Sequence, residues 1–79
     1  MGYTFKKLTH DLSIGHEIEF IYADRKFSIT NTPSGWCLAE YYKDEIQVYS
    51  SHLELLQHGS IDGKALRNIW PLVAVDAIF

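Results

Sequence analysis

Residues 16–30 read HEIEFIYADRKFSIT, and this stretch decides the fold class. Apolar residues alternate with charged or polar ones on both sides of a central Asp24-Arg25 pair. A period of two is typical of β-strands that bury one face. We therefore expect a hairpin that turns at Asp24-Arg25, although that turn lacks the glycine such hairpins favour. The turn places Phe20 opposite Ile29, so that the apolar side chains of both strands share one face.

A second hairpin follows a cluster of turn residues, NTPSG, at 31–35. Its strands are expected over 36–42 and 45–49, with the turn at Lys43-Asp44. An even loop divides the strand residues into two faces. One face is small and mostly apolar, and we expect helices to cover it; it comprises Cys37, Ala39, Tyr41, Ile46 and Val48. The opposite face is polar and aromatic; it comprises Trp36, Leu38, Glu40, Tyr42, Gln47 and Tyr49.

The segment before the first hairpin predicts a short amphipathic helix. Phe5, Leu8 and Leu12 recur at three- and four-residue spacing with polar residues between them, and Gly15 follows. This spacing places the three apolar side chains on one side of a helix that ends near Gly15.

Two further short helices and a final strand are expected after the second hairpin. Residues 51–54 match the helix capping box, and Gly59 is expected to end that helix in the left-handed conformation. Asp62 is suited to cap the next helix, which Pro71 ends. Alternation over 73–79 then predicts a strand that returns to the sheet.

These elements predict one α+β domain over residues 1–79. The expected architecture has two layers: an antiparallel sheet of four to five strands, made of two hairpins plus a C-terminal strand, with about three short helices on one face. A chain of 79 residues leaves no room for a second domain with its own core. So small a core needs the aromatic residues, 14% of the chain, first of all for packing.

Composition points to a cytoplasmic protein. The single Cys37 cannot form an internal disulfide, which small secreted domains usually need. Residues 2–12 carry charges in place of the apolar run of a signal peptide, and the longest apolar run, 70–75, is far too short to span a membrane. The formal charge of −3 and the scattered cations disfavour nucleic acid as a partner.

Few residues offer a route to catalysis or metal binding. The spacing of Cys37 from the histidines supports no nucleophile pair. His52 and His58 project about 240° apart around a helix, so they cannot share a metal ion. Glu40 lies among aromatic residues, where a carboxyl group can have a raised pKa and act as an acid, but it lacks a second group. We therefore predict no catalytic residue, no metal and no cofactor.

The aromatic face of the second hairpin is the strongest candidate for a binding surface. With helices on the small face, Trp and Tyr side chains remain exposed, and these residue types are enriched at recognition sites. The hypothesis is a small non-enzymatic module that binds a protein partner or a second copy through Trp36, Leu38, Glu40, Tyr42 and Tyr49.

Three alternatives remain open at this point. The terminal segments could cover the aromatic face, or a bulge could shift its parity, and either would make it core. The same aromatic side chains could stack the bases of a single-stranded nucleic acid. A small enzyme that uses Glu40 or Cys37 is the third.

Several segments resemble a group of short, uncharacterised proteins of Gram-positive bacteria and their mobile elements. They are GHEIEF at 15–20, Gly35-Trp36, LELL at 53–56, and IDGKAL at 61–66 ahead of Ile69-Trp70. These residues contribute to the fold and include no catalytic motif. The resemblance implies a stand-alone cytoplasmic domain and assigns no activity.

Overall fold

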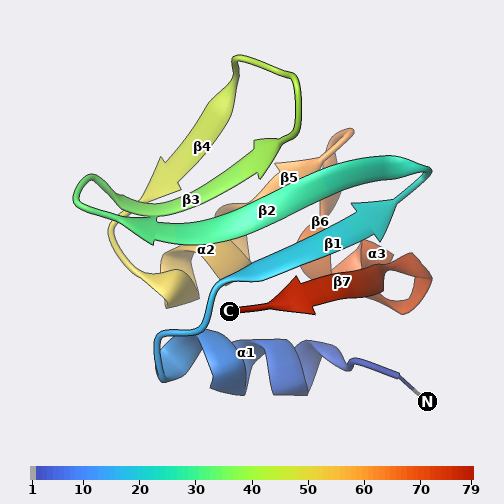
Figure 1. Ribbon diagram of the computed structural model, residues 1–79, viewed down its shortest axis with the longest axis horizontal. Coiled ribbons are helices and arrows are strands. Elements are labelled where there is room, and N and C mark those ends of the chain that lie inside the picture. The colour runs from blue at the N-terminus through green and yellow to red at the C-terminus, as the bar shows by residue number, and fades with distance from the viewer. Residues whose placement is uncertain (1) are drawn as a thin grey trace.

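The computed structural model describes residues 2–79 and shows an α+β domain of two layers (Figure 1). An antiparallel five-stranded sheet has the order β4-β3-β2-β1-β7, and β5 and β6 form a separate two-stranded hairpin. The elements are α1 (Phe5–Ser13), β1 (Ile18–Tyr22), β2 (Arg25–Thr32), β3 (Gly35–Glu40), β4 (Ile46–Tyr49), α2 (His52–His58), β5 (Ser60–Ile61), β6 (Lys64–Ala65), α3 (Leu66–Ile69), the 3-10 turn η1 (Trp70–Leu72) and β7 (Ala74–Ile78). The predicted fold class is confirmed.

The β1-β2 hairpin turns one residue earlier than expected. Tyr22 pairs with Arg25, so Ala23 and Asp24 form the turn, and their φ angles are 53° and 62°. Two positive φ angles match the right-handed twist of the flanking strands. Phe20 consequently lies opposite Phe27 instead of Ile29. The register shift is even, so the apolar face is the one that was predicted.

The β3-β4 hairpin also turns earlier than expected. β3 ends at Glu40, and the loop that follows it is longer than two residues. Ala39 lies opposite Ile46, and Trp36 lies opposite Tyr49. This shift is again even, so the division of the strand residues into two faces is confirmed. Only Tyr42 leaves its predicted face, since it lies in the loop with a φ of 67°.

The orientation of the second hairpin is the opposite of the predicted one. The β2-β3 connection is a two-residue turn at Pro33-Ser34, and it places Leu38 opposite Ile29. Because opposite residues share a face, Leu38 and Trp36 point into the core with Ile29. The helices therefore cover the aromatic face and leave the small apolar face uncovered.

The core lies between the sheet and the helices, and aromatic contacts hold its centre. Phe20 is fully buried; its ring stacks on Phe27 at 5.4 Å and meets the edge of Trp70 at 5.1 Å. The Trp70 indole N–H donates to the Tyr3 carbonyl oxygen, and the Tyr3 hydroxyl donates to the buried Asp11. These bonds fasten the N-terminal segment over the core.

The C-terminal third contains a hairpin where a longer helix was expected. Asp62 does not cap a helix; Asp62 and Gly63, with φ angles of 56° and 76°, form the tight turn between β5 and β6, and α3 begins only at Leu66. Ser51 caps α2 as predicted, since its hydroxyl accepts from the Glu54 amide at 3.2 Å. Gly59 is not left-handed, and its glycine is required because a Cβ would lie 2.6 Å from the Leu55 carbonyl oxygen.

The last strand returns to the sheet as predicted. β7 pairs with β1, and a bulge between Glu19 and Phe20 interrupts the register. None of the helices in residues 2–79 is long and apolar enough to cross a membrane.

Candidate functional site

The residues predicted to form an aromatic binding surface do not form one. Trp36 and Leu38 are 8% and 2% exposed, and Tyr49 is half-buried against the core. Tyr42 is fully exposed but lies apart, in the loop after β3. The expected exposure of this face is wrong because the β2-β3 turn directs it toward the helices.

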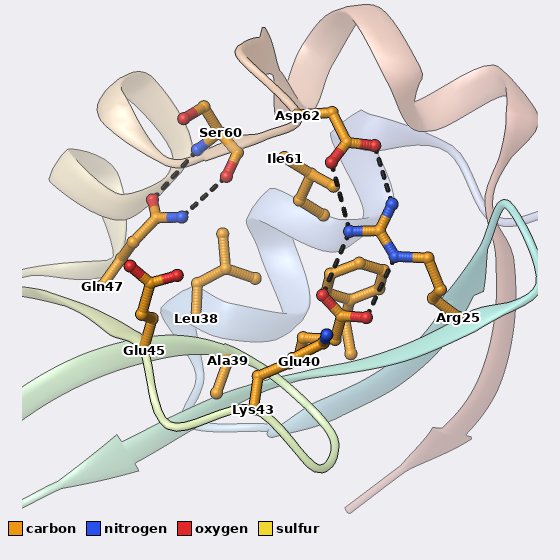
Figure 2. Close-up of a pocket in the computed structure, with 11 residues that line it drawn as sticks. Arg25, Leu38, Ala39, Glu40, Lys43, Glu45, Gln47, Ser60, Ile61 and Asp62 are labelled. Carbon is orange, nitrogen blue, oxygen red and sulfur yellow. Dashed lines mark hydrogen bonds and ion pairs between the residues drawn. The ribbon is translucent and has the colours of Figure 1, made fainter.

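Glu40, the fifth predicted residue, belongs to a charged cluster at one end of the sheet (Figure 2). Arg25 donates from Nε and Nη2 to the two Glu40 carboxylate oxygens, at 3.0 Å each. The same guanidinium donates to Asp62 at 2.7 and 3.2 Å. One arginine therefore joins β2, β3 and the β5-β6 turn.

A cavity of about 300 Å³ lies beside this cluster, between the sheet and the β5-β6 hairpin. On its other side the Gln47 amide donates to the Ser60 carbonyl oxygen at 2.7 Å and accepts from the Ser60 amide at 3.1 Å. The hydrogen bonds of Arg25 and of Gln47 pair polar groups of the β5-β6 hairpin with polar groups of the sheet. The walls of this cavity therefore serve first to hold the hairpin against the sheet.

The charges of the cluster oppose a role for Glu40 as an acid. The hydrogen bonds from Arg25 hold the pKa of the Glu40 carboxyl below its ordinary value of 4.5. The same guanidinium lowers the pKa of Asp62. A general acid at neutral pH needs a raised pKa, so the cluster keeps Glu40 ionised and unsuited to donate a proton.

We predict that Arg25 makes the free energy of unfolding depend on pH in the acid range. Groups whose pKa is lowered in the folded state stabilise the fold above their unfolded pKa, and this stability is lost as the pH falls through the folded pKa. For Glu40 the loss begins near pH 4.5 and continues below it. An Arg25→Gln variant should therefore be less stable than wild type at pH 7, with a smaller difference as the pH falls, as measured by urea unfolding at several pH values.

The control for this prediction is Arg67→Gln, which removes an arginine that lies over the Phe5 ring, away from the cluster. The difference between this variant and wild type in the free energy of unfolding should not change across the acid pH range. An NMR titration in which Glu40 of the Arg25→Gln variant titrates at or below its wild-type pKa would contradict the argument.

A second cavity, of about 400 Å³, lies at the N-terminal segment and has aromatic walls. Tyr3, Phe5 and Trp70 line it, and the Arg67 guanidinium lies at its rim, 5.5 Å from the Phe5 ring centre. It contains no residue that the sequence predicted as a site.

Cys37 and the histidines form no reactive arrangement in the described chain. Cys37 is buried on the uncovered side of the sheet, with its sulfur 3.6 Å from the Thr32 hydroxyl. His52 packs edge-on against Trp36, and the His16 ring bonds the Phe79 carbonyl oxygen. Within residues 2–79 no group of three or more His, Cys, Asp or Glu side chains could hold a metal ion.

The uncovered face of the sheet carries a group of exposed apolar side chains. Ile46 and Val48 on β4 are 56% and 49% exposed, and Tyr41 at the end of β3 is 36% exposed. Cys37 and Ala39 lie directly opposite Val48 and Ile46 on β3. We name this surface the open-face patch; it comprises Cys37, Ala39, Tyr41, Ile46 and Val48. These residues were expected under the helices.

Charged residues border the open-face patch on β1, β2 and β7. The Tyr41 hydroxyl donates to Glu19, and Lys26 lies 5.0 Å above the Tyr41 ring. The Lys26 ammonium also pairs with Glu19 at 3.2 Å and with Asp76 at 3.1 Å. Two carboxylates surround one ammonium, so this border is net negative and unfavourable for a phosphate backbone.

Comparison of the chain with protein-family models, with curated proteins and with solved structures found no match.

Proposed function

We propose that this protein is a small non-enzymatic interaction module that binds a protein partner through the open-face patch. The observation that carries this proposal is the one-sided sheet: helices cover one face, and two adjacent β-branched residues of β4 remain about half exposed on the other. The binding mode is that predicted from the sequence, moved to the opposite face of the same hairpin.

The patch has the character of a recognition surface. Full burial of a Val or Ile side chain stabilises a complex by about 1.5–3 kcal/mol relative to exposure. Because Ile46 and Val48 are about half exposed, burying each of them against a partner would stabilise the complex by about half of that amount. Tyr41, held in place by Glu19, adds an aromatic side chain that loses little freedom on binding.

The test compares patch and control variants of matched chemistry. Ile46→Lys/Val48→Lys places two charges on the patch, and Leu53→Lys/Leu72→Lys places two charges on similarly exposed residues outside it. Proteins that the immobilised wild type retains from an extract of the producing cells are purified and titrated against all three forms. We expect the patch variant to bind at least tenfold more weakly and the control to bind like wild type.

Equal binding by wild type and by the patch variant would overturn the proposal. So would an extract in which wild type retains nothing, its own chain included, that the patch variant does not also retain. Circular dichroism establishes that all three forms are folded.

A further inference from the structure

The outer edge of β4 is the feature from which we infer the partner. β4 is the terminal strand of the five-stranded sheet, and the ribbon of residues 2–79 shows no strand beyond it (Figure 1). A strand edge presents unpaired backbone N–H and C=O groups, which can pair with a strand from another chain.

This edge lacks most of the usual protection against such pairing. Proteins block exposed edges with charged residues, with proline, with bulges or by keeping the edge strand short, and β4, with four residues, has only the last of these. The strand Ile46–Tyr49 reads IQVY, which has no charge and no proline, and its register with β3 is uninterrupted. Its two exposed aliphatic side chains lie on one face.

We propose that a second copy of this chain pairs with β4, antiparallel, to give a continuous sheet across a symmetric dimer. This inference rests on the proposed function and names its partner. Strand addition supplies the backbone hydrogen bonds, and the joined open-face patches supply apolar contact.

The alternation of side chains selects the register of this pairing. Opposite residues of an antiparallel pair share a face, so Ile46 and Val48 can lie only opposite open-face residues of the second copy. With Gln47 on the symmetry axis, Ile46 lies opposite Val48 of the second copy on both sides of the axis. With Ile46 or Val48 on the axis, only one apolar pair forms. The Gln47-centred register therefore gains the most apolar contact.

Charge selects the antiparallel direction. Asp44 and Glu45 directly precede β4, and Ser50 and Ser51 directly follow it. A parallel pair would place the acidic residues of two copies side by side, where like charges repel. The antiparallel pair separates them and places Asp44 opposite Ser50 of the second copy.

Two measurements test this inference. Sedimentation equilibrium of the wild type under reducing conditions should show a species of twice the chain mass that Ile46→Lys/Val48→Lys converts to monomer. Disulfide trapping reports the register, using Ile46→Cys and Val48→Cys in a Cys37→Ser background. The background is needed because Cys37 lies opposite Val48 in the same chain.

The Gln47-centred register predicts that a mixture of the two cysteine variants oxidises to a heterodimer, while each variant alone forms at least fivefold less disulfide. Leu53→Cys, at an exposed position of α2, measures random collision. Efficient oxidation of Val48→Cys alone or of Ile46→Cys alone would overturn the register. A wild type that stays monomeric up to millimolar concentration would overturn the dimer; patch-dependent binding of another protein would then still support the proposed function.

Discussion

Phe20→Ala is expected to remove a large share of the free energy of unfolding of the protein at room temperature. Phe20 is fully buried and contacts both Phe27 and Trp70, so truncation removes the ring that joins the sheet to the C-terminal segment. Replacing a buried Phe by Ala costs about 3–5 kcal/mol. A domain of this length has a total stability of about 4–12 kcal/mol. The loss is therefore a large share of the whole, and urea unfolding followed by Trp fluorescence measures it.

Phe79→Ala is the matched control, because the Phe79 side chain is 63% exposed while its backbone pairs with Glu17. This variant should lose less than about 1 kcal/mol, as surface substitutions usually do. Equal losses for the two variants would contradict the assignment of Phe20 to the centre of the core.

The sequence was sufficient to predict the fold class because the alternation of apolar and polar residues assigns the same buried face even when the predicted register is wrong by an even number of residues. Both hairpins turn earlier than expected, yet each shift is even, and an even shift leaves every strand side chain on its own face. Ile18 and Phe20 are buried with Phe27 and Ile29, as the pattern at 16–30 indicated. The predicted strand boundaries were wrong where backbone dihedral angles determine them, as at the Ala23-Asp24 turn.

The orientation of the second hairpin depends on the turn that joins it to the first hairpin, and alternation within each hairpin does not determine it. Pro33-Ser34 is a two-residue turn, and it places Leu38 opposite the core residue Ile29. Alternation continued across that turn directs Trp36 and Leu38 inward and leaves Ile46 and Val48 exposed. The signal for the open-face patch was therefore present in the sequence.

The Arg25 cluster could not be predicted in the same way. Arg25 contacts Glu40 and Asp62, which lie 15 and 37 residues away in the chain. Asp62 was expected to cap a helix, although Asp-Gly at 62–63 is also a strong signal for a tight hairpin turn. Only the tertiary position of that hairpin brings the two carboxylates to one guanidinium.

Gly35→Ala is expected to destabilise the protein by about 3 kcal/mol or more, because it combines backbone strain with a collision. Gly35 has a φ of +127°, a region that residues with a side chain rarely adopt. A Cβ there would lie 2.4 Å from the Tyr49 carbonyl oxygen on β4, and backbone atoms cannot move aside as a flexible side chain can. Urea unfolding measures the loss.

Gly15→Ala separates the two causes, because Gly15 has a φ of +93° but nothing beyond its chain neighbours lies within 4 Å of the position that a Cβ would take. It should cost about 1–3 kcal/mol from strain alone. The collision at Gly35 also pushes on β4, the strand proposed to pair with a second copy. Gly35→Ala should therefore weaken dimerisation more than Gly15→Ala does when sedimentation is measured under conditions where both variants are folded. Equal effects of the two variants on unfolding would show that β4 yields to the added methyl group, and β4 would then be a poor template for a second strand.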